Sequence, residues 1–167
     1  MDIAVDLTDL IVPIDSVQPL ERNARRGNVA AIAESLSRWG QVKPIVVSSD
    51  GQILAGNHTH AAAVTLGWTE IAAVSLPVHS EDVEAVALAI ADNRTSDLSR
   101  WENDLLADLL TEVAGVDAEL LEATGFSAEQ VAELVAFTDG PAAAGGPVGE
   151  DDNGSGGAVC PTCQRAL

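Results

Sequence analysis

The segment from residue 52 to residue 67 constrains the fold of this chain more than any other. Residues 52–55 (Gln-Ile-Leu-Ala) form a short apolar stretch typical of a β-strand and run into Gly56. A polar cluster follows at residues 57–60, and the alanine-rich residues 61–66 predict a helix that Gly67 closes. A strand, a glycine and a helix start bring free backbone N–H groups and the positive end of the helix dipole to one point. That arrangement suits an anion, usually phosphate.

The side chains of the polar cluster leave two interpretations open. Two imidazoles and a hydroxyl add hydrogen-bonding groups for phosphate, and a glycine lets the backbone approach it without a Cβ. In the alternative, an Asn or Thr caps the helix and both histidines face solvent. The residues predicted to hold the anion are Gly56, Asn57, His58, Thr59 and His60.

Periodicity along the rest of the chain predicts a mixture of helices and strands. Aromatic residues are only 3% of the chain, so the core must consist mainly of Ala, Val, Leu and Ile. Asp50-Gly51 is a hairpin signal, and Gly40 is placed to end a helix whose apolar face runs from Val29 to Trp39. Polar residues 92–94 interrupt the apolar pattern that precedes them. We expect strands at 12–17, 44–48, 52–55 and 71–77, and helices at 29–39, 80–90, 101–113, 118–123 and 128–137.

The formal charge of −18 is unevenly distributed. Residues 1–100 hold seven basic and 13 acidic side chains, whereas residues 101–167 hold one and 13. Nucleic acid is repelled by such a chain at long range, so direct DNA contact needs a local basic patch. Arg22, Arg25, Arg26, Arg38 and Lys43 provide either that patch or a solvated, mixed-charge face. No apolar run is long enough to cross a bilayer, and we expect a cytoplasmic protein.

The end of the chain changes composition. Gly, Pro, Ala and acidic residues dominate residues 138–158, which predicts a disordered linker. Cys160 and Cys163 then follow with the spacing of a zinc knuckle. Structural zinc needs four ligands, so a zinc site here would require a second copy of the chain, in a homodimer, or another partner. An unmetallated thiol pair is the alternative.

Five segments, in this order, resemble the N-terminal domain of the ParB/sulfiredoxin superfamily, in particular the ParB-like proteins of phages and plasmids. The resemblance implies an α+β fold, a small mixed sheet with packed helices. It implies a nucleotide-binding domain at residues 1–113, an acidic helical extension at 114–137 and the tail at 138–167. The segments are Val12-Pro13-Ile14-Asp15, Arg22-Asn23-Ala24-Arg25, residues 32–47 with Gly40-Gln41, Gly56-Asn57-His58-Thr59, and Asp92-Asn93-Arg94.

The same resemblance implies a ligand. In the superfamily, the loop matching residues 56–60 holds nucleotide phosphates: those of CTP in chromosome-partition proteins, and of ATP or ADP in sulfiredoxin and a free-serine kinase. Arg25, Arg26 and Arg94 are expected to approach the phosphates, and Asn93 to help hold Mg²⁺. Gln41 is a further candidate for contact with the base or phosphate. Thr59 stands where the family most often has Arg, which removes a charged fork for phosphate.

The enzymatic implications are divided. In the serine-kinase relative, an acid on the helix matching residues 29–39 is the catalytic base, so Glu34 is either a base or part of a polar helix face. Sulfiredoxin chemistry needs a cysteine where this chain has Asn57. We therefore predict a protein that binds ATP or CTP with Mg²⁺, as a switch or slow NTPase in phage or plasmid DNA biology. The alternatives are a DNA-binding or nuclease ParB-like protein, and an acidic DNA mimic that binds a DNA-associated host protein.

Overall fold

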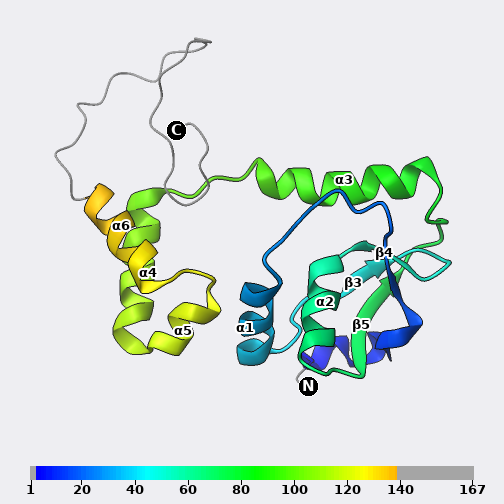
Figure 1. Cartoon of the computed structure of the whole chain (residues 1–167), viewed down its shortest axis with the longest axis horizontal. Coiled ribbons are helices and arrows are strands. Elements are labelled where there is room, and N and C mark those ends of the chain that lie inside the picture. The colour runs from blue at the N-terminus through cyan, green and yellow to red at the C-terminus, as the bar shows by residue number, and fades with distance from the viewer. Residues whose placement is uncertain (1–2, 139–167) are drawn as a thin grey trace, which may run out of the picture. The chain divides into compact units, whose positions relative to one another are not determined.

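The computed structural model describes residues 3–138, which form two compact units (Figure 1). The first unit contains the residues up to Arg100 together with Glu122–Gly125, and the second contains Trp101–Leu121 and the residues from Phe126 onward. The α+β class predicted from the sequence is confirmed: a five-stranded mixed sheet with packed helices. The predicted domain limits at 113 and 137 stay predictions.

The sheet of the first unit has the strand order β1-β5-β3-β4-β2. Its central strands β3 and β4 form the antiparallel hairpin that Asp50-Gly51 predicts, and Gly51 has a φ of 81°. Strand β5 runs parallel to β3 and antiparallel to β1, while β2 runs parallel to β4. The strands are β1 (Ile11–Pro13), β2 (Gln18–Pro19), β3 (Ile45–Val47), β4 (Gln52–Ala55) and β5 (Glu70–Ser75).

The single strand predicted at residues 12–17 is wrong. The chain leaves β1 at Pro13 and makes a 3-10 turn, η2 (Ile14–Ser16), before β2. The Ser16 hydroxyl donates to the Pro13 carbonyl at 2.6 Å, which closes this turn. The turn lets two adjacent stretches of chain reach opposite edges of the sheet. A second 3-10 helix, η1 (Val5–Leu10), precedes β1 and was not expected from the sequence.

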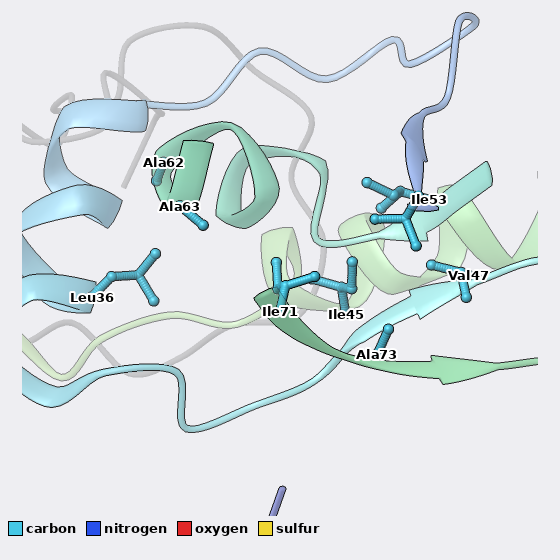
Figure 2. Packing of buried hydrophobic residues seen from close by; sticks show 9 residues of the cluster. Leu36, Ile45, Val47, Ile53, Ala62, Ala63, Ile71 and Ala73 are labelled. Carbon is cyan, nitrogen blue, oxygen red and sulfur yellow. The ribbon is translucent and has the colours of Figure 1, made fainter. Parts of the chain in front are cut away.

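Helices α1 (Val29–Trp39) and α2 (Asn57–Thr65) pack against each other and cover the sheet. Figure 2 shows Leu36 of α1 and Ala62 and Ala63 of α2 facing the isoleucines of the sheet. The bounds of α1 are those predicted: Asn28 accepts from the Ala31 N–H at the start, and Gly40, at a φ of 68°, ends the helix. Trp39, however, is 44% exposed and lies outside the core.

Helix α3 (Val83–Asp97) follows β5 and packs against β4. The predicted interruption at residues 92–94 is wrong, because the helix continues through them to Asp97. Asp92 and Arg94 are exposed and Asn93 is half-buried, so none of these polar side chains is buried in the core. Polar residues at these positions are therefore compatible with a continuous helix.

The second unit is a small helical cluster made of α4 (Asn103–Val116), α5 (Ala118–Ala123) as far as Leu121, and α6 (Ala128–Thr138). Leu106 and Leu110 of α4 pack with Leu121 of α5 and Leu134 of α6. A capping box stabilises the start of α6: the Ser127 hydroxyl accepts from the Gln130 N–H at 3.2 Å, and the Gln130 side chain accepts from the Ser127 N–H at 2.9 Å.

Two predictions fall outside this description. The linker beyond Thr138 and the zinc knuckle at Cys160 and Cys163 lie outside the described residues. Among residues 3–138, the helices are too short or too polar for any of them to traverse a lipid bilayer.

Candidate phosphate-binding cavity

Helix α2 begins four residues earlier than the sequence predicted. Gly56 is its N-cap, so the polar cluster forms the first turn of the helix instead of preceding it. The first bond of the helix runs from the His60 N–H to the Gly56 carbonyl at 2.9 Å. The N–H groups of Asn57, His58 and Thr59 therefore have no acceptor within the helix and are available to a ligand.

Gly56 is required at this position for two reasons. Its φ of 93° lies in the left-handed region, which side chains with a Cβ disfavour. A Cβ at this position would also lie 2.6 Å from Cγ2 of Ile45, a core residue that is only 2% exposed. The glycine thus lets β4 turn sharply into α2 while packing against β3.

The first turn of α2 opens into a large cavity of about 1190 Å³. The cavity is bounded by the segment before α1, the end of β4, the start of α2, helix α3 and the segment that leads into α3. It brings together residues that lie far apart in the sequence. The predicted site residues that line it are Gly56, Asn57, His58, Thr59, Arg25, Asn93 and Arg94.

Residues 20–28, here called the strap, are tied to the first turn of α2 by two side chains. The Asn57 carbonyl oxygen Oδ1 accepts from the Leu20 N–H at 3.0 Å, while its Nδ2 donates to the Ile53 carbonyl. Nε2 of His58 accepts from the Gly27 N–H at 2.9 Å, which puts the proton of the neutral ring on Nδ1. A Cβ on Gly27 would lie only 2.8 Å from that Nδ1. Asn57 and His58 therefore position the strap as well as lining the cavity.

Arg25 connects the strap to α3. Its guanidinium donates to the Asn93 carbonyl at 3.3 Å and to Oδ1 of Asp97 at 3.1 Å. Figure 1 shows this segment running beside α3 before it enters α1. Because the two side chains of the ion pair are 39% and 30% exposed, the pair adds little stability and serves mainly to orient the guanidinium. Arg94 lies on α3 at the same cavity.

A polar group at the cavity lining was not recognised in the sequence. Asp50, in the β3–β4 turn, accepts from the Ser80 hydroxyl at 2.6 Å and from the Ser80 N–H at 2.8 Å. These bonds, the hydroxyl bond first, hold the pKa of the Asp50 carboxyl well below its usual range. His79 Nε2 lies 3.7 Å from the same carboxylate. The sequence predicted a turn at Asp50, but the neighbouring residues gave no indication that Asp50 would bind Ser80, 30 positions away.

Charges of both signs line the cavity. Its cationic groups are three arginines: Arg22, Arg25 and Arg94. Its carboxylates are Glu21, Asp50, Glu81, Asp92 and Asp97. Asp97 and Asp50 already accept hydrogen bonds from Arg25 and Ser80. The N–H groups of α2 and the arginines thus provide the anion-binding part of a cavity whose remaining lining is mixed.

Two predicted phosphate or base contacts are not in the cavity. His60 is only 8% exposed and its Nε2 lies 3.2 Å from the Ile14 carbonyl, so it joins α2 to η2 instead. Gln41 is 1% exposed: its side chain accepts from the Ala72 N–H at 2.7 Å and donates to the Ala72 carbonyl at 2.9 Å. Both predictions are corrected: these two polar side chains bind backbone groups within the fold.

Two further predicted residues also lie outside the cavity lining. Glu34 is exposed on α1, which leaves the predicted catalytic base without a place at the site. Arg26 is exposed and donates to the Asn23 carbonyl at 2.9 Å, so it stabilises the strap rather than reaching the cavity. Within residues 3–138, no three His, Cys, Asp or Glu side chains are grouped to hold a metal ion, and Mg²⁺ binding by Asn93 stays a prediction.

Residues 5–94 match the protein family described as the ParB N-terminal domain. Among solved structures, the C-terminally truncated chromosome-partitioning protein ParB from Caulobacter crescentus, complexed with CTP-gamma-S, is similar with 17% identity and a TM-score of 0.56. That likeness covers 77% of this chain and 84% of that chain. A Pnob8-like ParB-N domain is similar with 17% identity and a TM-score of 0.47, over 72% and 50% of the two chains.

The truncated Caulobacter crescentus ParB complexed to the centromeric parS site shows 21% identity and a TM-score of 0.42, over 79% of this chain and 73% of that chain. No curated protein sequence matches this chain. At 17% identity, the likeness to the CTP-gamma-S complex is one of fold.

Proposed function

Because this chain belongs to the ParB N-terminal domain family, we propose that it binds a nucleoside triphosphate in the cavity at the start of α2. Family membership supports a nucleotide- or DNA-binding role of the ParB kind. The observation that carries the nucleotide proposal is the meeting, in one cavity, of the first turn of α2 with Arg25 and Arg94. Free helix N–H groups and guanidinium groups are the donors that phosphate oxygens prefer.

The rest of the cavity suits the nucleoside. Its volume, about 1190 Å³, is slightly above the usual range of small-molecule sites, so a nucleotide fits within it. Apolar side chains from the strap, α1, β4 and α3 form part of its lining, which suits the faces of a base and ribose. These side chains are Leu20, Ile32, Leu54, Val86 and Ile90. The solved relative of the same fold carries CTP-gamma-S, so CTP is the first ligand to test and ATP the second.

Nucleotide binding is proposed to act as a switch through the strap. The strap is held at Asn57 and His58 of α2 and, through Arg25, at α3. Phosphates bound at the start of α2 compete for Arg25 and for the imidazole, so they change how the strap is held. Slow hydrolysis remains a secondary proposal, because Glu34, the one base predicted for it, is not at the cavity. We place this switch in phage or plasmid DNA biology.

Direct DNA binding receives less support from this chain. Residues 101–138 contain nine acidic side chains and no Lys, Arg or His, so the helices of the second unit repel a phosphate backbone. A nucleotide switch that acts with another protein on DNA agrees with both the family and this charge.

Isothermal titration of the full chain tests the proposal. CTP, ATP and their diphosphates are titrated with and without Mg²⁺, into wild type, Arg94→Ala and the control Arg100→Ala. Arg100 is exposed and outside the cavity lining, so Arg100→Ala changes the net charge by the same amount as Arg94→Ala but leaves the cavity intact. Losing a charged hydrogen bond worth about 1.5–3 kcal/mol weakens binding roughly 10- to 150-fold in Arg94→Ala alone. The proposal fails if no nucleotide binds wild type, or if the two variants lose affinity equally.

A further inference from the structure

The second unit carries an apolar surface that its own core does not use. Helix α4 packs Leu106, Ala107 and Leu110 against α5 and α6. One residue earlier in each turn, Leu105 and Leu109 are 54% and 51% exposed. Val116 (78% exposed) continues the same helical spacing at the end of α4, and Trp101 (71% exposed) lies two residues before the helix begins. We call Trp101, Leu105, Leu109 and Val116 the apolar stripe; it runs along α4, a helix about 20 Å long.

A line of carboxylates lies directly beside this stripe. Asp104, Asp108 and Glu112 follow each other at four-residue spacing on α4, and all three are exposed. We call them the acidic row. Like charges at this spacing repel each other, and the sequence of residues 101–138 offers no Lys, Arg or His to neutralise them. The row therefore weakens the isolated unit, and a cationic partner would relieve that repulsion.

We propose that the apolar stripe and the acidic row together form a docking surface for a basic amphipathic helix of another protein. The partner places its apolar face on Leu105 and Leu109, and Lys or Arg at the edge of that face lies over the acidic row. Charge complementarity selects this occupant over a second copy of the chain, because two acidic rows would repel each other across a symmetric interface. It also selects a protein over DNA, because a phosphate backbone meets nine carboxylates and no Lys, Arg or His among residues 101–138.

The proposal is separate from nucleotide binding. All residues of the stripe and the row lie in the second unit, whereas the cavity residues lie in the first. A variant of α4 should leave nucleotide affinity unchanged, and Arg94→Ala should leave docking unchanged. Failure of one proposal is therefore distinguishable from failure of the other.

The test measures binding of a fluorescent synthetic peptide, about 18 residues of Leu and Lys at helical spacing, to the full chain. The comparison peptide has Glu in place of Lys. Three variants are measured. The stripe variant carries Leu105→Ser and Leu109→Ser, and the row variant carries Asp104→Asn, Asp108→Asn and Glu112→Gln. A control variant removes two charges from α6 through Glu129→Gln and Glu133→Gln. All the substituted residues are exposed, and circular dichroism checks that each variant folds.

The lysine peptide is expected to bind wild type and to lose at least about tenfold in affinity with each of the first two variants. The α6 control should stay within about twofold of wild type, and the glutamate peptide should not bind. The proposal is overturned if the lysine peptide does not bind wild type. It is also overturned if the serine variant binds the peptide as tightly as wild type, because binding would then depend on charge alone. Light scattering that shows self-association abolished by the serine variant would overturn it in favour of a second copy.

Discussion

Replacing Gly56 with alanine tests the geometry on which the candidate site depends. Two costs follow from the structure. An alanine in the left-handed region costs about 1–2 kcal/mol. The new Cβ would also meet Cγ2 of Ile45 at 2.6 Å, and crowding of that kind in a packed core costs about 1–3 kcal/mol. Gly56→Ala should therefore reduce the free energy of unfolding by about 2–5 kcal/mol.

Gly67→Ala is the matched control. Gly67 also has a positive φ, 74°, but a Cβ there would have no neighbour within 4 Å among residues 3–138. Gly67→Ala should therefore reduce the free energy of unfolding only by the cost of the left-handed conformation, about 1–2 kcal/mol. Urea unfolding followed by circular dichroism gives both values, with the slope of each transition checking that the unfolded states are comparable. Equal destabilisation by the two substitutions would refute the close packing of Gly56 on Ile45 and, with it, the tight turn that starts α2.

Three further outcomes follow from other contacts. Gly27→Ala should weaken CTP binding in calorimetry, because its Cβ would displace the strap from His58. Since Gly27 is exposed, the unfolding free energy should change by no more than about 0.5 kcal/mol; unchanged affinity would mean that the strap does not take part. Gln41→Leu should lower the free energy of unfolding in urea by about 2–6 kcal/mol, since it leaves two buried backbone groups of β5 without a partner, and a neutral result would contradict that role. Ser80 holds the pKa of the Asp50 carboxyl low, so the ionised carboxylate stabilises the folded state at pH values above the pKa of Asp50 in the unfolded chain, and this stabilisation is lost as the pH falls. Asp50→Asn should therefore reduce the loss of stability below about pH 4. An unchanged dependence of the unfolding free energy on acid pH would contradict this role of Asp50.

Much of the fold could be predicted because its signals are local. Helix α1 has the bounds that its apolar spacing and Gly40 indicated, and the hairpin formed where Asp50-Gly51 placed it. Helix α3 was cut short in the prediction because the polar residues from Asp92 to Arg94 look like a break in a one-dimensional pattern. On the folded helix none of them is buried in the core and all three line the cavity, so the backbone of the helix continues through them.

The candidate site was predictable only in part, for the same reason. Gly56 and residues 57–59 of α2 are adjacent in sequence, and the structure places them together at the cavity. His60 and Gln41 have the same chemistry as a ligand-binding residue, but their partners are the backbone of Ile14 and Ala72, which are 46 and 31 residues away. Contacts between residues so far apart cannot be recognised from neighbouring residues in the sequence. Only the structure distinguishes a polar side chain that is buried for structural reasons from one that can bind a ligand.

The most direct test of the account is the position of bound nucleotide relative to the first turn of α2. In the full ¹⁵N-labelled chain titrated with CTP and Mg²⁺, the amide resonances of Asn57, His58 and Thr59 should shift and saturate with one common Kd. The amides of Ala128 and Glu129, at the start of α6, provide an internal control and should not move. Saturable binding that leaves the amides of α2 unshifted, or that shifts both helix starts alike, would contradict the claim that the phosphates are held at the start of α2.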